Sequence, residues 1–226
     1  EKINTGFLTE SKKPKKTEKL AVWIRGNFFI PDARKFWVKP SVKYLRKYLT
    51  ENKVDAIIST GPPHSMHLIA LQLKKEFKDI PWIADFRDPW TNIDFYKDLM
   101  LSKSADKKHH KLEQAVLKNA DVTLTVGKTL GVELLELGAN RVEVIPNGFD
   151  QDDSLKDVEL DEKISFAHIG SMTSTRNPEV LWKALSELIT QSSELHTRLE
   201  IKLVGKVDVS VMQSLENYGL LPYLNI

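Results

Sequence analysis

The segment 61–67 (GPPHSMH) places His64 and Ser65 directly after a stiff Gly-Pro-Pro turn. Histidine can donate a hydrogen bond or accept a proton near neutral pH, and N–H groups at the start of a helix attract polar or anionic ligands. The segment therefore predicts a pocket for a hydroxylated or anionic ligand, with His64 as donor or base. The alternative is structural: Ser65 caps a helix and His67 packs at its flank.

The segment 85–90 (DFRDPW) brings two carboxylates, a guanidinium and two aromatic rings together within six residues. Sugar hydroxyls are recognised by donors and acceptors that stand beside aromatic faces, and this segment supplies both. We therefore expect Asp85, Arg87 and Asp88 to line a saccharide site. The alternative is an ion pair of Arg87 with Asp85 or Asp88 that closes a turn.

The segment 170–177 (GSMTSTRN) is rich in small hydroxyl residues, which leave backbone N–H groups accessible to a ligand. Arg176 lies just before a predicted helix, where its positive charge opposes the helix dipole unless an anion binds there. The segment from Gly170 to Arg176 thus predicts a phosphate contact. The alternative is that Glu179, in the first turn of the helix, neutralises Arg176.

Other chemical motifs are weaker. The run 127–129 (GKT) looks like the end of a phosphate-binding P-loop, but Val122 stands where that motif needs Gly. The histidine pairs 64/67 and 109/110 lack carboxylate partners at metal-ligand spacing, so we expect no metal site. The absence of Cys excludes a thiol nucleophile and a disulfide scaffold.

Each of the three segments follows a predicted strand. From about residue 20, short β-rich apolar runs alternate with amphipathic segments, a pattern that predicts parallel sheets with crossover helices. The strands predicted in the first part of the chain are 20–24, 54–60, 82–85, 122–126 and 142–146. Ligands of such folds bind beyond the carboxyl ends of the strands, where the segments lie.

The composition changes at 150–163 (DQDDSLKDVELDEK), an acidic run without periodicity that we predict to be a linker. Strands at 164–170 and 199–205 then alternate with helices at 177–189 and 209–219, and a further strand starts at 223–226. Asn177 is expected to cap its helix, with Pro178 in the first turn. The predicted domains are therefore 1–149 and 164–226, the second one incomplete.

The overall composition is that of an ordinary soluble protein, with 33 Lys+Arg against 31 Asp+Glu and 41% hydrophobic residues. A net charge of +2 gives no field that favours nucleic acid, and the Lys run at 12–19 reads as a solvated loop. Without an apolar run of eighteen residues or a signal peptide, we predict a cytoplasmic protein. Because the first residue is Glu and the last segment is apolar, we expect both ends to be cut.

Four phrases resemble the family-4 glycosyltransferases of two-domain GT-B architecture, especially bacterial members of polysaccharide assembly. They are 31–40 (PDARKFWVKP), 55–75 (DAIISTGPPHSMHLIALQLKK), 82–90 (WIADFRDPW) and 144–150 (VIPNGFD). A weaker match follows at 168–185. The resemblance implies Rossmann-like parallel sheets in both domains and transfer of a sugar from a nucleotide diphosphate donor to an acceptor hydroxyl. It further implies retention at the anomeric carbon and no cofactor or essential metal.

The resemblance also implies roles for the residues of each segment. His64 would hydrogen-bond acceptor or donor-sugar hydroxyls, and Asp85, Arg87 and Asp88 would line the same cleft of an acceptor-side domain. Asn147 would lie at the crossover to the donor-nucleotide domain. The implied partners are a nucleotide sugar and a saccharide or lipid-linked saccharide, with no nucleic acid. A lipid-linked acceptor would bring the enzyme to the inner face of the membrane.

Relatives carry Arg after the glycine that corresponds to Gly170 and Lys five positions later, whereas this chain has Ser171 and Arg176. One usual diphosphate contact is thus absent. The family's Gly-rich loop would precede residue 1 and its Glu-x7-Glu element would follow residue 226, so we expect little activity from the isolated chain. Two alternatives remain: a non-catalytic sugar or nucleotide binding module, which Ser171 favours, and a sugar-nucleotide epimerase of the same two-domain plan.

Overall fold

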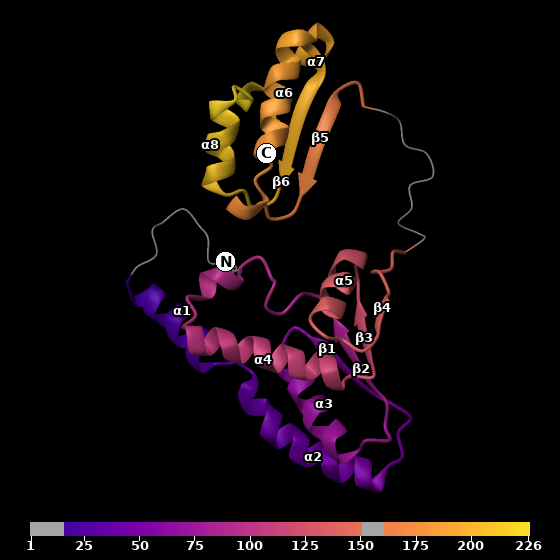
Figure 1. Ribbon diagram of the computed structural model, residues 1–226. Coiled ribbons are helices and arrows are strands. Elements are labelled where there is room, and N and C mark those ends of the chain that lie inside the picture. The colour runs from indigo at the N-terminus through magenta and orange to yellow at the C-terminus, as the bar shows by residue number, and fades with distance from the viewer. Residues whose placement is uncertain (1–15, 151–160) are drawn as a thin grey trace. The chain divides into compact units, whose positions relative to one another are not determined.

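A computed structural model of the chain describes residues 16–150 and 161–226, which form two compact units (Figure 1). We call them the N-terminal unit and the C-terminal unit. Both are α/β with parallel strands, which confirms the predicted fold class. Most of the predicted linker 150–163, and residues 12–15 of the Lys run, lie outside the described residues.

The N-terminal unit is built on a parallel sheet with the strand order β1-β2-β3-β4. Its strands are β1 (Ile57–Gly61), β2 (Trp82–Phe86), β3 (Val122–Thr125) and β4 (Val142–Val144). Gly61 pairs with Phe86, so β1 and β2 end at the same level of the sheet. The segments 61–67 and 85–90 therefore leave the sheet side by side.

Helices surround this sheet and share its core. They are α1 (Lys16–Phe28), α2 (Val38–Glu51), α3 (Ser65–Glu76), α4 (Lys103–Asn119) and α5 (Lys128–Glu136), with short 3₁₀ turns at Lys35–Trp37 and Tyr96–Leu99. Helix α3 lies between α2 and α4 (Figure 1). Trp82, Phe86 and Leu117 are fully buried in the main cluster, and Val42 and Leu73 pack α2 on α3.

The predicted strand at 20–24 is wrong, because these residues belong to α1. Periodicity alone does not distinguish a short apolar run in a strand from one in a helix. Leu20, Trp23 and Ile24 also fit the spacing of one helix face. Gly26 lies against Leu99, whose carbonyl oxygen would be 2.5 Å from a Cβ at residue 26. The described sheet therefore has four strands instead of the five predicted, and α2 was not predicted.

The C-terminal unit has a smaller parallel sheet of order β5-β6-β7, formed by β5 (Ile164–Ile169), β6 (Leu199–Val204) and β7 (Leu224–Asn225). Its helices are α6 (Glu179–Gln191), α7 (Ser193–Arg198) and α8 (Val209–Asn217), and 3₁₀ turns lie at Ser174–Arg176 and Leu221–Tyr223. Helices α6 and α8 stand on one side of β5 and β6 (Figure 1). Trp182, Leu203 and Leu215 are buried between these layers.

Helix α6 begins at Glu179, two residues later than predicted, with Pro178 directly before it. Asn177 does not cap the helix through its side chain, so that expectation is wrong. Instead its Oδ1 accepts a hydrogen bond of 2.7 Å from Trp182 Nε1, and its Nδ2 donates one of 2.8 Å to Ser214 Oγ. Packing against the buried indole therefore decides the conformation of Asn177.

Candidate functional site

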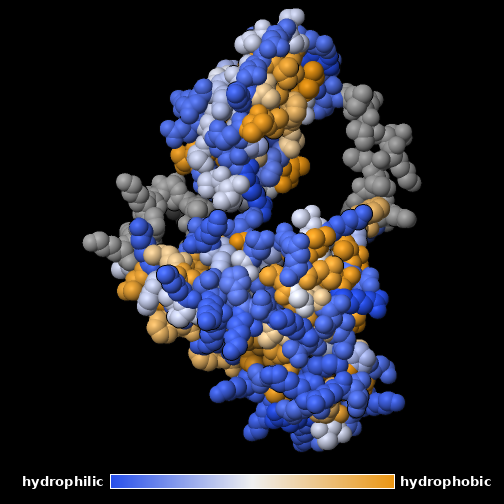
Figure 2. Space-filling view, viewed as in Figure 1, coloured by the Kyte–Doolittle hydropathy of each residue, from blue (hydrophilic) through white to orange (hydrophobic). Residues whose placement is uncertain are grey.

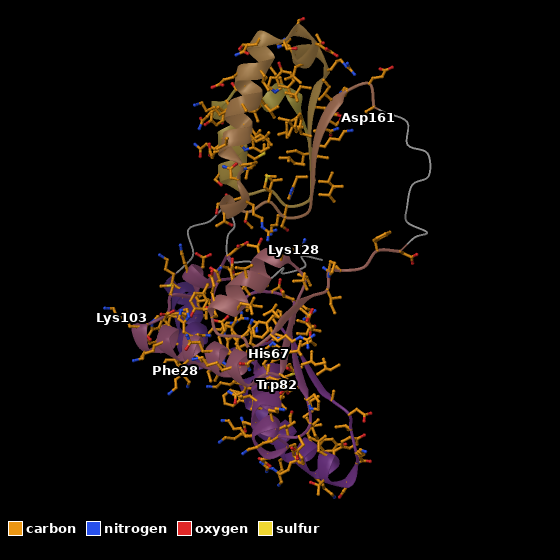
Figure 3. The ribbon with its side chains drawn as sticks, turned by 45° about the vertical axis from the view of Figure 1, so that its right-hand side comes forward. Phe28, His67, Trp82, Lys103, Lys128 and Asp161 are labelled. Carbon is orange, nitrogen blue, oxygen red and sulfur yellow. The ribbon has the colours of Figure 1, made fainter. Side chains whose placement is uncertain are left out.

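The candidate site lies in the N-terminal unit, where β1 and β2 end. The two following loops are joined directly, since the Arg87 N–H donates to the Gly61 carbonyl at 3.2 Å. His64 and His67 come from the first loop and the start of α3, and Trp90 comes from the second loop. Figure 3 labels His67 and Trp82, which both lie inside this unit.

Stacked rings fix both histidines. The His64 and Trp90 rings are nearly parallel, with centroids 4.6 Å apart, and the His67 and Phe86 rings are stacked at the same separation. His67 is completely buried, and 8% of His64 remains exposed. His64 is therefore held rigidly while a small part of it stays open to a ligand.

Burial also determines the charge of these two side chains. It lowers the pKa of His64 to about 4, an effect that the Asp32 carboxylate opposes and His109 reinforces. Burial likewise lowers the pKa of His67 to about 3, with a further contribution from His64. Both imidazoles are neutral at physiological pH, so each can donate through one ring nitrogen and accept through the other.

Asp32 holds the start of α3, beside His64. Its Oδ2 accepts from the Ser65 N–H at 2.8 Å and its Oδ1 from the Ser65 hydroxyl at 2.9 Å. The contact thus comes from a distant carboxylate, so the alternative in which Ser65 itself caps the helix is wrong. Sequence reasoning missed this residue, because Asp32 is 33 positions from its partner and no local pattern links the two.

The three candidates of the second loop lie at the same sheet end as His64. Asp85 is half-buried and its Oδ2 accepts from the Thr60 hydroxyl at 2.7 Å. Arg87 and Asp88 are exposed, and the Arg87 guanidinium donates to the Pro62 carbonyl at 2.7 Å. Within the described residues Arg87 pairs with neither carboxylate, so the alternative of an ion pair that closes the turn is wrong. Arg87 instead ties its loop to the histidine loop.

Helix α4 holds the second loop through hydrogen bonds of two buried side chains. Glu113 is almost completely buried, and its carboxylate accepts from the Thr91 N–H at 3.2 Å and the Thr91 hydroxyl at 2.6 Å. Burial raises the pKa of Glu113, and burial lowers the pKa of His109, whose Nδ1 accepts from Trp90 Nε1 at 3.1 Å. Sequence reasoning missed Glu113 and considered His109 only as a possible metal ligand. Their spacing of four with Val116 at the next turn places all three on one helix face, a signal that could have found them.

The residues predicted to bind phosphate lie in two other segments, one after β5 and one after β4. Gly170 is exposed with φ at 131°, a conformation that favours glycine, and its N–H donates to the Val204 carbonyl at 2.8 Å. Ser171 and Arg176 are exposed in the same segment of the C-terminal unit, and the Glu179 carboxylate accepts from Asn177 at 3.0 Å. Asn147 is exposed in the segment after β4 of the N-terminal unit. Its role at the crossover stays a prediction.

The described parts of the chain hold neither a metal-binding cluster nor a membrane-spanning helix. No cluster of three or more His, Asp or Glu side chains there could hold a metal ion. No helix within 16–150 or 161–226 combines the length and the apolar character needed to cross a bilayer.

Residues 6–153 match the sequence pattern of the family described as Glycosyltransferase Family 4. Sucrose-phosphate synthase from Thermosynechococcus elongatus has a similar structure, with a TM-score of 0.54 and 16% identity over 85% of this chain and 49% of that one. The chain thus spans about half the length of that protein. A second similar structure is a mutant of S. aureus TarM in complex with Fondaparinux, alpha-GlcNAc-glycerol and UDP (TM-score 0.47, 15% identity, 82% of this chain, 35% of that one). No curated protein matches the chain.

Proposed function

The chain belongs to Glycosyltransferase Family 4 and has the GT-B type of α/β fold, and on this basis we propose that it forms part of an enzyme that transfers a sugar from a nucleotide diphosphate to an acceptor hydroxyl. The observation that carries this proposal is the family match, which covers the whole of the loop pair around His64. Retention at the anomeric carbon and a role in cell-surface polysaccharide or glycolipid synthesis are further parts of the proposal.

The loop pair suits the binding of sugar hydroxyls. His64 is neutral and rigid, so it can exchange hydrogen bonds with a hydroxyl without the cost of burying a charge. Arg87 and Asp88 are exposed in the loop after β2, and Asp85 adds a carboxylate that the Thr60 hydroxyl already orients. We propose that these four residues contact acceptor or donor-sugar hydroxyls.

We propose that the segment from Gly170 to Arg176 contacts the diphosphate of the donor, together with Asn147. The exposed hydroxyl residues Ser171, Ser174 and Thr175 and the exposed Arg176 support this assignment. Ser171, in place of a second cation, favours the other candidate function: a family member that binds a nucleotide sugar without turnover. The two candidates differ in whether sugar is released from the donor when an acceptor is present.

Transfer can be tested by expressing the complete gene product and incubating it with a panel of nucleotide sugars and saccharide acceptors. Arg87→Ala should reduce turnover at least about tenfold, because it removes an exposed contact of the site. Arg46→Ala, which removes an exposed arginine of α2 that pairs with Glu76, is the matched control and should keep full turnover.

Thermal stabilisation by nucleotide sugars, measured on the same variants, separates the alternatives. Stabilisation without turnover would support the binding module. A fall in melting temperature of Arg87→Ala in proportion to its activity would show that Arg87 only holds the loops together.

We further propose that the N-terminal unit contacts the inner face of a membrane at a surface formed by α1 and the turn at 35–37. Leu20, Trp23, Ile24 and Phe28 are exposed along one face of α1, and hydrophobic residues gather there in Figure 2. Phe36 and Trp37 are exposed as well, and cations lie over both rings: Lys35 over Phe36 and Arg34 over Trp37. Aromatic residues flanked by cations suit the interface of an anionic bilayer.

This contact can be measured by co-sedimentation with phosphatidylcholine vesicles that contain or lack phosphatidylglycerol. The double variant Trp23→Ser/Phe28→Ser should lose most of the binding to anionic vesicles. Tyr44→Ser removes a more exposed aromatic residue from α2 and serves as the control. Equal binding of the double variant and the wild type would exclude α1 as the contact.

A further inference from the structure

A chain of buried hydrogen bonds leads from Trp82 toward the two histidines. The Trp82 indole N–H donates to the Ser59 hydroxyl oxygen at 2.9 Å, and that oxygen lies 2.8 Å from His67 Nδ1. Trp82 and His67 are completely buried and Ser59 almost so. This series of hydrogen bonds is therefore shielded from solvent, and the positions of its protons depend only on Trp82, Ser59 and His67.

The direction of this chain follows from its first member. An indole nitrogen can only donate, so the Ser59 oxygen accepts from Trp82. Ser59 then has one proton to donate, and His67 Nδ1 is the remaining partner that the described residues offer it. Because burial keeps His67 neutral, its own proton must then lie on Nε2.

The protonated nitrogen of His67 and a nitrogen of His64 both lie close to Gly61. His67 Nε2 and His64 Nδ1 are both buried and neither has a hydrogen-bond partner among the described residues. A Cβ on Gly61 would lie 2.5 Å from His67 Nε2 and 3.1 Å from His64 Nδ1. The two nitrogens are thus no farther apart than two hydrogen bonds of about 2.8 Å each, which one oxygen atom can span.

We infer that a buried water molecule bridges His67 Nε2 and His64 Nδ1 beside Gly61. Through this water, Ser59 and His67 act as positioning residues that keep the proton of His64 on its Nε2 atom. The water accepts a hydrogen bond from His67 Nε2–H and donates one to His64 Nδ1. If His64 Nδ1 carried a proton instead, the water would accept from both rings, and its own two protons would be buried without an acceptor on either ring. The inference rests on the proposed function only for its consequence. His64 presents an N–H to a sugar hydroxyl oxygen or a phosphate oxygen, and it acts as a hydrogen-bond donor instead of a base.

The tautomer of His64 can be read directly by long-range ¹H–¹⁵N correlation spectra of the 226-residue chain labelled with ¹⁵N-histidine. The His64 signals are assigned by their loss in His64→Gln. At neutral pH and without any sugar, both His64 and His67 should show a protonated Nε2 and an unprotonated Nδ1. A His64 ring protonated on Nδ1 in the wild type would overturn the inference without any variant.

Variants of Ser59 test the chain of hydrogen bonds. Ser59→Ala should convert the single tautomer of His64 into a mixture, while Ser59→Thr retains the hydroxyl and should restore it. Thr123→Val, which removes a buried hydroxyl of β3 that has no partner among the described residues, is the control for loss of a polar group. An unchanged His64 pattern in a folded Ser59→Ala variant would show that Ser59 does not control the tautomer.

These spectra need no substrate, so they distinguish the inference from the proposed function. The expected tautomers in a protein that transfers no sugar would refute only the proposed function. Transfer of sugar by a protein with His64 protonated on Nδ1 would refute only the inference.

Discussion

The two units differ in where they keep their polar groups. The N-terminal unit buries His64, His67, His109 and Glu113 at and below the ends of β1 and β2. Beside its apolar core in α6, α8 and β6, the described part of the C-terminal unit buries only two polar side chains, Glu200 and Ser214, and most of its hydroxyl-rich segment after β5 is exposed. A site of buried side chains is fixed before any ligand arrives, whereas exposed side chains become ordered only when a ligand binds.

The largest effects should come from the central tryptophan of each unit. Trp82→Ala and Trp182→Ala each remove a buried indole and its hydrogen bond, to Ser59 and Asn177 respectively, and should cost about 3–5 kcal/mol of unfolding free energy. Each variant should reduce hydrogen-exchange protection only in its own unit, and each is the control for the other. Equal loss of protection in 161–226 upon Trp82→Ala would show that the units unfold together.

Acid should destabilise the N-terminal unit through its histidines. His64 and His67 have pKa values of about 4 and about 3 in the folded state and about 6.5 when unfolded, so the unfolded state binds protons first as the pH falls. Stability is therefore full above about pH 6.5 and decreases below it. Going from about pH 7.5 to about pH 5.5 should cost about 1.4 kcal/mol for each histidine.

Urea unfolding at both pH values, followed by hydrogen exchange in residues 16–150, measures this loss. The lowered pKa of His109 adds to this loss of stability. The raised pKa of Glu113 opposes the loss once the pH approaches the pKa of Glu113 in the folded state. His64→Gln should make the N-terminal unit less sensitive to acid. A pH dependence that this variant leaves unchanged would contradict the assignment.

Replacing one glycine by alanine in each unit tests where the backbone requires glycine. Gly205 has φ at 127°, and a Cβ there would lie 2.4 Å from the Gly170 carbonyl oxygen, so Gly205→Ala should cost at least about 2 kcal/mol. Gly127 is the N-cap residue of α5, with φ at −140° and open space around it, so Gly127→Ala should cost no more than about 1 kcal/mol. Thermal unfolding of both variants decides the comparison.

The smallest expected effect concerns two helix caps. Asp208 caps α8 locally, accepting from the Ser210 N–H at 2.9 Å, whereas Asp32 caps α3 from a distant part of the chain. Asp32→Ala and Asp208→Ala should each cost about 1 kcal/mol in urea unfolding. Only Asp32→Ala should also lower the pKa of His64 further, which a histidine NMR titration would detect. Asp55→Ala, at an exposed carboxylate, is the control.

Local sequence patterns predicted most of the described strands and helices. The strand predicted at 54–60 is β1 and that at 82–85 is β2, and the helix predicted at 209–219 is α8. Such elements follow from their own spacing of apolar residues. The strand predicted at 20–24 is wrong because a five-residue apolar segment fits a strand and a helix equally well, and the residues belong to α1.

The candidate site was only partly predictable for a related reason. His64, Asp85, Arg87 and Asp88 could be placed at strand ends, because parallel strands end at one edge of the sheet. Asp32 and Glu113 could not be linked to them, since their partners lie 33 and 22 positions away. Hydrogen bonds over such separations depend on how the helices pack.

The sequence by itself determined the parallel α/β plan, the loops that carry polar residues and the membership in Glycosyltransferase Family 4. These depend on residue types and spacing along the chain. Only the tertiary structure decided that His64 and His67 are neutral, that Asp32 holds α3 and that α4 supports Trp90. Burial and long-range hydrogen bonds set those properties, and both arise only when distant segments are packed together.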